Sequence, residues 1–341
     1  MPKLLYEEVA EIYHYTTITG LKGIVESQNL WATHYAYLND AEEVKHFNER
    51  LKLVLRPVLE KIFADFKNSA PDKYEHLGRG HGAIAKLIDN EANTLVTILY
   101  RTLLDDFDSG PYITSFCRAP TEKEQKHGLL SQWRAYGPDG GCAVAFGTKE
   151  IHDLLKLEQD KWAYAALGGG DVVYSDEDER LQEEIGQYMD NIKASFTRFY
   201  EIIMSRGLQG QEEAERALDG IYPAIWPCSC RYKHWGFKEE KEVRLVAIGQ
   251  ALETRRLAEE DGLRLKPEKP KKHFLRRGTA VPYIELFDGI PTPSKHRLPI
   301  KGVIVGPHPE KQKRAKAIEI LLREHQIDAP AAYSDIPYLG A

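Results

Sequence analysis

Two carboxylates enter one of the most regular apolar stretches of the sequence. Glu240 and Glu242 stand two residues apart at the start of the alternating run 242–248, and Arg244 follows at the same spacing. In an extended chain these three side chains share one face, and the apolar residues take the other. Such a pair can place one catalytic carboxylate beside a helper. The alternative is a charged, solvated strand face with an ion pair between Glu242 and Arg244.

A histidine on the first predicted strand is the next candidate. His14 lies in the short aromatic and β-branched stretch IYHYT, followed by Tyr15 and Thr16. Its imidazole could bond a ligand hydroxyl or satisfy a carbonyl of the core. Both interpretations remain open from the residues alone.

Aromatic residues also gather between positions 31 and 40, where a predicted strand passes into a helix. Trp31 and Tyr37 could stack on a planar ligand ring, or they could form the rim of the core. Asn39 and Asp40 end this segment, and both have a structural explanation as turn and N-cap residues.

The segment 132–137 combines an indole, a guanidinium and a phenol, from Trp133, Arg134 and Tyr136. Apolar strands are predicted on both sides of it, so it must lie at an end of the sheet as a loop or a short helix. There it could line a ligand cleft. Alternatively, Trp133 and Tyr136 are buried against inserted helices and Arg134 is solvated.

The spacing of the remaining candidate residues argues against other kinds of site. Cys228 and Cys230 lack a second Cys/His pair at zinc spacing, so we expect no metal. The glycines 168–170, predicted as a loop, are not followed by Lys-Ser/Thr, and no GxGxxG is present, so both phosphate-binding fingerprints are missing. The sequence also has no GxSxG, the motif of the serine-hydrolase nucleophile elbow. A basic run at 264–277 is interrupted by Glu268 and two prolines, which favours a solvated linker over a phosphate site.

The elements that must position these residues are short strands between long helices. Strands are predicted at 12–16, 30–35, 111–116, 141–146, 171–175, 242–248, 281–286 and 301–306, and helices at 18–27, 40–66, 82–106, within 178–225 and at 309–325. This irregular order predicts an α+β fold with one mixed sheet. We expect a single elaborated domain over residues 1–341, with helical insertions at about 40–106 and 178–225.

Composition bounds the class of protein. The 341 residues are 42% hydrophobic and 29% charged, which excludes a disordered or fibrous chain. The net charge of -6 means that a nucleic-acid partner would need a local basic patch. No apolar run approaches the roughly 20 residues that span a bilayer, no signal peptide is evident, and four cysteines do not make a disulfide framework. We expect a cytoplasmic protein with no membrane partner.

Taken in order, the motifs resemble those of a widespread bacterial family of uncharacterised proteins. Its members share a YHYT-type strand, an LND-x-E turn, an SF strand, an LLSQWRAYG-like segment, an E-x-EVRL strand and a VIVGP strand, which here are Tyr13–Thr16, Leu38–Glu42, Ser115–Phe116, Leu129–Gly137, Glu240–Leu245 and Val303–Pro307. The match covers nearly the whole chain. That family is similar, more distantly, to the ADP-ribosyltransferase superfamily.

The superfamily resemblance implies an ADP-ribosyltransferase-like mixed β-sheet core with large helical insertions. It implies that His14 binds an NAD ribose and that Trp31, with Tyr35 or Tyr37 as substitutes, stacks on nicotinamide. It also implies that Glu242, with Glu240 as helper, stabilises the oxocarbenium-like state of the ribose. The remaining residues expected around NAD are Tyr15, Thr16, Asn39, Asp40, Trp133, Arg134 and Tyr136.

The function expected from this resemblance is that of an NAD-dependent ADP-ribosyltransferase, a toxin or phage-defence effector that modifies a protein or a nucleic acid. NAD would be the substrate. Two alternatives remain: a catalytically inert module of the same fold that binds a nucleotide or a partner, and a hydrolase of NAD or of a phosphodiester that uses the same carboxylates.

Overall fold

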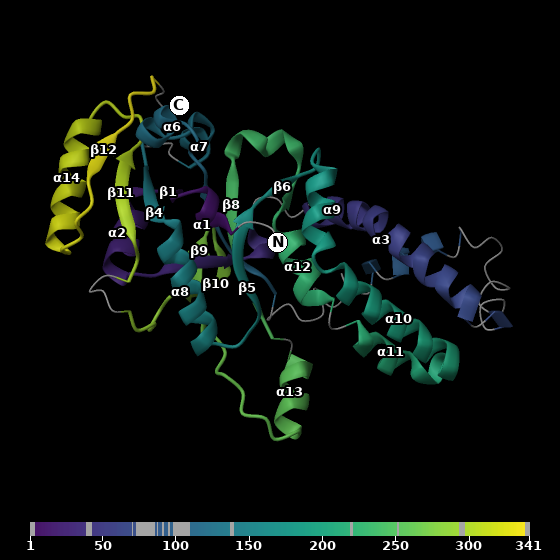
Figure 1. Ribbon diagram of the computed structural model, residues 1–341. Helices are drawn as coiled ribbons and strands as arrows, with labels where there is room; N and C mark the ends of the chain where they lie inside the picture. The colour runs from purple at the N-terminus through teal and green to yellow at the C-terminus, as the bar shows by residue number, and fades with distance from the viewer. Residues whose placement is uncertain are drawn as a thin grey trace. The chain divides into compact units, whose positions relative to one another are not determined.

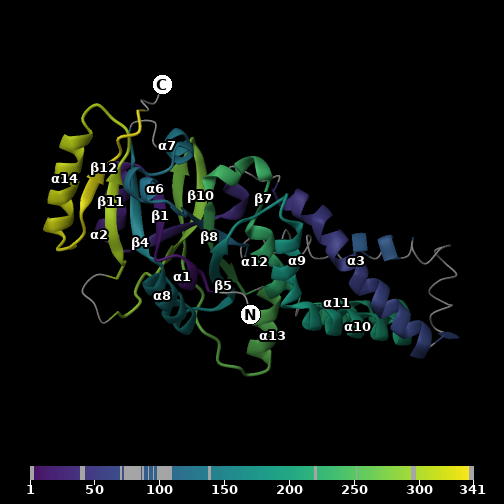
Figure 2. The same cartoon turned by 45° about the horizontal axis from the view of Figure 1, so that its top comes forward.

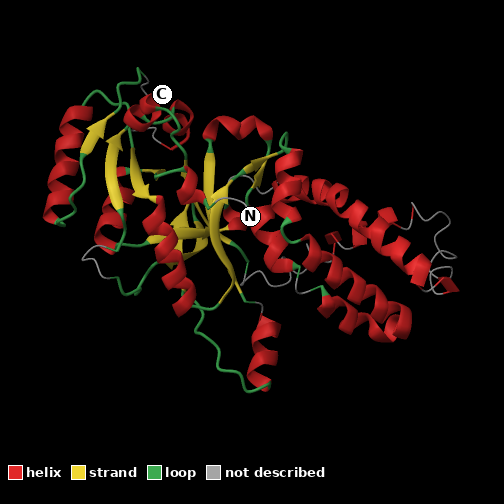
Figure 3. Cartoon of the chain, viewed as in Figure 1, coloured by secondary structure: helices red, strands yellow, loops and turns green. Residues whose placement is uncertain are grey.

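A computed structural model describes residues 4–38, 43–69, 71–72, 110–136, 140–218, 221–250, 252–292 and 297–337, with short helical pieces between 86 and 97. The chain divides into two compact units. The helical unit comprises Asn39–Gly110 and Ser175–His234, and the sheet unit comprises Pro2–Leu38, Pro111–Tyr174 and Trp235–Ala341. Figure 1 follows the chain by colour, and Figure 3 distinguishes its helices from its strands.

The helical unit is formed by the two stretches predicted as insertions. Its described elements are α3 (Glu43–Ser69), α9 (Asp178–Gly186), α10 (Met189–Arg206), the 3-10 turn η3 (Gly207–Gly210), α11 (Gln211–Ala217), α12 (Tyr222–Cys230) and the short strand β7 (Tyr232–Lys233). The long amphipathic helix predicted from residue 40 is confirmed as α3, which contains Pro57. The helix predicted at 82–106 lies mostly outside the described residues.

Apolar contacts between α3 and α10 hold this unit together. The ring of Phe63 on α3 lies 4.9 Å from that of Tyr200 on α10, and both side chains are buried. Between α12 and α9, Arg231 donates two hydrogen bonds to the carboxylate of Glu184. The unit therefore has an apolar core of its own.

The sheet unit is built on one ten-stranded sheet. Its order is β12 (Ala331–Tyr333), β11 (Ile300–Val305), β4 (Cys142–Gly147), β1 (Glu11–Thr16), β3 (Tyr112–Cys117), β2 (Leu30–His34), β10 (Thr279–Leu286) and β9 (Lys271–Arg276), while β8 (Glu242–Gly249) pairs with β3 and with β5 (Tyr164–Asp171). Every pair is antiparallel except β11 with β12. The predicted α+β class, with a mostly antiparallel sheet and many helices, is confirmed.

The remaining elements of this unit surround the sheet. They are α1 (Leu5–Glu8), α2 (Ile18–Ser27), η1 (Tyr35–Tyr37), α6 (Glu122–His127), α7 (Leu130–Tyr136), α8 (Thr148–Lys161), β6 (Val173–Tyr174), η4 (Trp235–Glu240), α13 (Leu252–Glu260) and α14 (Lys311–Glu324). In both ribbon views α14 lies alongside β11 and β12 (Figure 1, Figure 2). Among the described helices of the chain, none is both long and apolar enough to cross a bilayer.

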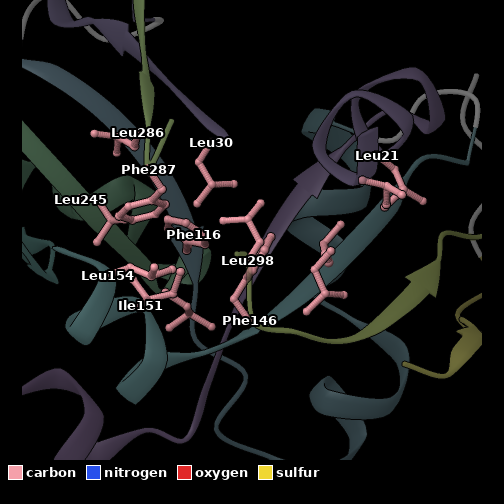
Figure 4. Packing of buried hydrophobic residues seen from close by; sticks show 14 of the residues in the cluster. Leu21, Leu30, Phe116, Phe146, Ile151, Leu154, Leu245, Leu286, Phe287 and Leu298 are labelled. Carbon is pink, nitrogen blue, oxygen red and sulfur yellow. The ribbon is translucent and has the colours of Figure 1, made fainter. Parts of the chain in front are cut away.

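Strand alternation gives the sheet two different faces. One carries the main core, in which Phe116, Phe146 and Leu245 pack with Leu21 of α2 and Ile151 of α8 (Figure 4). The other carries a smaller cluster in which the side chains of β1 and β4 pack under α7, formed by Tyr13, Tyr15, Cys117, Ala119, Leu129, Trp133, Ala143, Ala145 and Ile304. We call these the core face and the α7 face.

The two edges of β3 are paired differently. On one edge, β8 pairs with β3 along its whole length, from Tyr112 to Cys117. On the opposite edge, β1 pairs only at Cys117, and β2 pairs only at Tyr112 and Ile113. β1 and β2 therefore part over the middle of β3, and we call the backbone edge of residues 114–116 the gap.

The predicted loop at residues 168–170 is wrong, because these glycines lie inside β5. A Cβ on Gly169 would collide with the side chain of Leu245 on the neighbouring strand, so glycine permits the close approach of β5 to β8. A glycine run carries no alternating pattern, and the sequence therefore gives no strand signal there.

The predicted solvated linker at 264–277 is also wrong over its second half, which forms the edge strand β9. Backbone pairing with β10 runs from Lys271 to Arg276, and a tight turn at Arg277 and Gly278, both with positive φ, joins the two strands. The strand escapes a sequence pattern because its side chains are exposed except for Phe274, which is partly buried.

We expect Gly141→Ala to lower the free energy of unfolding by about 1–3 kcal/mol, as overpacking does. A Cβ at residue 141 would lie 2.5 Å from the carbonyl oxygen of Thr16, at the end of β1. Gly168→Ala is the matched control, because a Cβ there meets no atom within 4 Å. Urea denaturation measures both, and equal stabilities of the two variants would contradict the close approach of β1 and β4.

Candidate functional site

The strongest polar feature of the sheet unit is an ion pair at the start of β8. Arg244 donates from Nε to Oε1 of Glu242 at 2.8 Å and from Nη2 to Oε2 at 3.2 Å. The two residues are 6% and 4% exposed. The predicted ion pair is confirmed, but the predicted solvation of this strand face is wrong, because both side chains are buried.

The backbone around Glu242 is held as firmly as its side chain. The Glu242 N–H donates to the Tyr174 hydroxyl at 3.1 Å, and the Glu242 carbonyl accepts from the Val172 N–H at 2.9 Å. Opposite Arg244, β5 carries Gly170, so no side chain stands beside the guanidinium on that strand. The pair is therefore fixed in position, as a preorganised electrostatic group must be.

Glu240 does not share the strand face of Glu242, contrary to the prediction. It ends the 3-10 turn η4, and Lys241 adopts a left-handed conformation, with a φ of 48°, before the strand begins. The Lys241 Nζ lies 2.5 Å from Oε1 of Glu124. This turn separates the two carboxylates that simple alternation would place on one face, and only Glu242 and Arg244 remain on the strand.

A second charged cluster flanks the start of β8. Arg118 donates from Nε and Nη2 to the two oxygens of Asp171, both at 2.5 Å, and from Nη2 to Glu8 at 2.9 Å. Its backbone N–H donates to the carbonyl of Lys241. Sequence reasoning missed this cluster, because its residues come from three separate segments and none of them stands in a periodic pattern.

His14 lies at the gap in β3. Its Nδ1–H donates to the carbonyl of Ser115 at 2.8 Å, and its ring lies 5.6 Å from that of Phe116. Burial lowers the pKa of the imidazole, although the hydrogen bond to Ser115 opposes this effect. A carbonyl only accepts, so Nδ1 carries the proton and Nε2 of the neutral ring is an acceptor. Of the two roles left open for His14, the structure shows the carbonyl contact, and the bond to a ligand hydroxyl stays a prediction.

Tyr15 and Trp133 have complete structural roles on the α7 face. Their rings meet edge to face at 4.7 Å, and the Tyr15 hydroxyl accepts from the Leu129 N–H at 2.7 Å. The Trp133 indole donates to the carbonyl of His127 at 2.9 Å. Trp133 is 1% exposed. Trp133 is thus buried, as the packing interpretation held, but against β1 of the sheet and not against inserted helices.

The other predicted ligand contacts lie in varied surroundings. Arg134 and Tyr136 are exposed on α7, a short helix as predicted, and Thr16 is partly buried at the end of β1. Tyr37 lies in η1, with its ring 5.9 Å from that of His34. Asn39 and Asp40 lie outside the described residues.

Trp31 is exposed on β2, but its indole is engaged by neighbouring rings. It lies 4.2 Å from the ring of Tyr283 on β10 and 5.6 Å from that of Phe274 on β9. Both partners lie on strands on the far side of β2 from β3. The indole therefore leans away from the gap at which His14 lies.

His14 and Glu242 lie on strands β1 and β8, which pair with opposite edges of β3. Adjacent strands lie about 4.8 Å apart, so the two backbones are about 10 Å apart. Glu242 is in register with Tyr13 and Cys117 and shares the α7 face with them. His14 follows Tyr13 and therefore projects to the core face, beside Phe116.

Two further observations concern metal ligands and cavities. Among the described residues, no group of three His, Cys, Asp or Glu side chains is placed to hold a metal ion. A cavity of about 40 Å³ on the core face, lined in part by Tyr6, Ile12 and His152, has room for water but not for a nucleotide.

Comparison with known families covers a third of the chain. Residues 132–245 match the model of a family described as a protein of unknown function, DUF2971. A search of curated proteins and a search of solved structures found no match to this chain. The matched stretch runs from α7 to β8 and so contains Glu242 and Arg244, whereas His14 and Trp31 precede it. Over that stretch the chain resembles an uncharacterised protein family.

We expect strong coupling between Glu242 and Arg244 in a double-mutant cycle. Glu242→Gln and Arg244→Met should each cost about 3–5 kcal/mol of stability, because each leaves a buried partner unmatched, whereas the double variant should cost far less than their sum. Urea denaturation of the four proteins gives the coupling. The control is the pair Glu150 and Lys301, whose side chains are 48% and 41% exposed and should couple by about 1 kcal/mol or less. Similar coupling in both pairs would contradict the burial of the first.

We expect His14 to make stability depend on pH. The folded chain holds the imidazole neutral with a lowered pKa, whereas the unfolded chain titrates near 6.5, so the unfolded state takes up the proton first as pH falls. The free energy of unfolding should therefore decrease as the pH falls below about 6.5, by up to about 1.4 kcal/mol for each pH unit. His14→Gln should make the loss less steep between pH 5 and 7.

The matched control is His273→Gln on the edge strand, because the His273 side chain is exposed in the folded chain. Urea denaturation at several pH values measures all three proteins. If His14→Gln and His273→Gln both keep the pH dependence of the parent, His14 is not the group responsible.

Proposed function

We propose that this protein is an NAD-dependent ADP-ribosyltransferase of ADP-ribosyltransferase-like fold, with its active site at the gap between β1 and β2. The observation that supports the proposal is that β1 and β8 pair with the two edges of one strand, β3. His14 lies on β1 and Glu242 lies on β8, so both residues stand beside the same central strand.

The chemistry assigned to Glu242 follows from its surroundings. Cleavage of the nicotinamide glycosidic bond builds positive charge on the ribose, and a carboxylate that accepts from the 2′-hydroxyl stabilises that charge. Arg244 donates to both oxygens of this carboxylate. Arg244 would thus hold the carboxylate ionised and oriented toward the ribose.

His14 has a binding role in this proposal. Its neutral Nε2 would accept from a hydroxyl of the other ribose. The hydrogen bond from Nδ1 to Ser115 fixes the ring orientation and the tautomer. A ligand held at both riboses has its reacting carbon positioned, which is the main contribution that fixed groups make.

A second candidate function is a nucleotide-binding module without turnover. It is favoured by the 6% exposure of Glu242 and by the engagement of both its oxygens with Arg244. In that case the pair is a structural element of β8, and a nucleotide would bind at the gap through His14 without being cleaved.

The test is release of nicotinamide from labelled NAD by the full chain, with protein, DNA and RNA offered as acceptors. Glu242→Asp keeps the charge opposite Arg244 but withdraws the carboxylate by about 1 Å, so turnover should fall by about 10²-fold while the protein stays folded. His14→Ala should weaken NAD binding by about 1–3 kcal/mol in calorimetry, with a smaller effect on the rate of the bound complex.

Four outcomes separate the candidates. Release of nicotinamide with transfer of the ADP-ribose label to an acceptor, both strongly reduced in Glu242→Asp, supports the transferase, whereas release with the label found only on free ADP-ribose indicates hydrolysis. NAD binding that depends on His14, without any release, supports the binding module. If the folded parent protein neither binds nor cleaves NAD, both candidates are wrong.

A further inference from the structure

Three aromatic rings form one cluster on the α7 face of strands β2, β10 and β9. Trp31 lies 4.2 Å from Tyr283 and 5.6 Å from Phe274, and Phe274 lies 5.8 Å from Tyr283. The register explains the cluster, because Tyr283 stands opposite both Thr33 of β2 and Lys272 of β9. Tyr283 is 6% exposed, whereas Trp31 is 47% exposed. The buried ring thus holds an exposed indole in place.

Basic side chains flank these rings on the same face. Lys272, Phe274 and Arg276 alternate along β9, so all three project to the side of the sheet on which Trp31 lies. The segment 264–277 holds seven Lys and Arg residues and one acidic residue, in a chain whose net charge is -6. Positive charge is therefore concentrated beside the exposed ring.

Some of these basic side chains are paired with acidic residues, which reduces the positive charge that a ligand would meet. Lys269 is buried against Glu158, and Lys272 pairs with Glu285 at 2.6 Å, with a side chain that stays 50% exposed. Arg276 donates to the carbonyl of Tyr37 and is exposed. The Glu285 side chain is 13% exposed, so this pair is only partly screened by solvent, and the exposed part of the Lys272 side chain is the part that can face a phosphate.

We propose that this surface, formed by Trp31, Phe274, Tyr283, Lys272 and Arg276, binds single-stranded nucleic acid. An exposed aromatic ring on a sheet stacks on a base of any sequence, and neighbouring cations bind the phosphates, which is how sequence-tolerant single-strand sites work. A duplex hides its bases within the stack and offers no ring to Trp31. An acidic peptide would use the cations but would have no use for the indole.

The binding test uses the full chain and no NAD, so its result is independent of the proposed enzymatic activity. Fluorescence anisotropy follows labelled oligouridine and oligodeoxythymidine of about 12 nucleotides, a duplex of equal length and a polyglutamate peptide. We expect both single strands to bind more tightly than the duplex and the peptide. Preference between the RNA and the DNA strand distinguishes the two sources of the ligand.

Trp31 supplies the sharpest variant. Trp31→Leu keeps an apolar side chain on β2 but removes the ring, and should weaken binding roughly 5- to 150-fold, whereas Trp31→Phe keeps a stacking face and should retain most of the affinity. Circular dichroism confirms that both variants are folded. Equal affinities of the parent and Trp31→Leu would overturn the proposal.

The basic residues give a second, independent readout. Lys272→Gln with Arg276→Gln removes two phosphate contacts, so the slope of log affinity against log salt should become shallower by about 1.4 for a single strand. The control is Lys313→Gln with Lys316→Gln on α14, whose side chains are 81% and 77% exposed and which should leave the slope unchanged. An unchanged slope in the first variant, tighter binding of polyglutamate, or displacement of the oligonucleotide by NAD would each overturn the proposal.

Discussion

The middle of β3 imposes the constraint on which the site depends. A strand inside a sheet must satisfy its backbone groups on both edges, and here β8 satisfies one edge along its whole length. On the other edge β1 and β2 leave a stretch between them, and two side-chain contacts cross it. His14 donates to the carbonyl of Ser115, and the Thr114 hydroxyl donates to the carbonyl of Trp31. The parting of β1 and β2 is thus stabilised by specific polar contacts.

The buried pair Glu242 and Arg244 contributes little net stability to the fold, but it fixes the orientation of a carboxylate. Removing two charges from water costs several kcal/mol each, and their mutual attraction often does no more than offset this cost. Well-packed apolar residues would serve the fold of β8 as well. What such a pair does provide is a fixed direction for its carboxylate, because a two-point contact with a guanidinium permits only one orientation. In the proposed function, this fixed direction is the contribution of the pair.

Much of the sheet could be predicted from the sequence, because its buried strands carry apolar and β-branched residues between clear turns. The runs at 111–116, 141–146 and 242–248 correspond closely to β3, β4 and β8. Two strands escaped this reasoning for opposite reasons: glycines in β5 carry no side-chain pattern, and β9 is charged on an exposed edge. Both are held by backbone pairing with a partner that is itself apolar.

Among the site residues, too, local features could be predicted from the sequence and contacts between distant segments could not. The pairing of Glu242 with Arg244 is a local property of strand alternation and could be predicted, but its burial depends on β3 and β5, which are distant in sequence. The left-handed Lys241, which separates Glu240 from the strand, has no local signal in its residue type. The aromatic character of Tyr15 and Trp133 indicated a ligand or a core equally well, and only the contact between them shows that they pack together.

The division of the chain into interleaved segments also determines the order in which a ribosome can complete the two units. The helical unit ends at His234, whereas β8 begins at Glu242 and β10, β9 and β11 follow it. When the last helical residue has been synthesised, β3 still lacks the strand along its long edge, β2 lacks its neighbour β10, and β4 lacks β11. The helical unit can therefore finish folding on the ribosome while the sheet is still incomplete. The pair Glu242 and Arg244, which is central to the proposed chemistry, is synthesised only after the helical unit is complete.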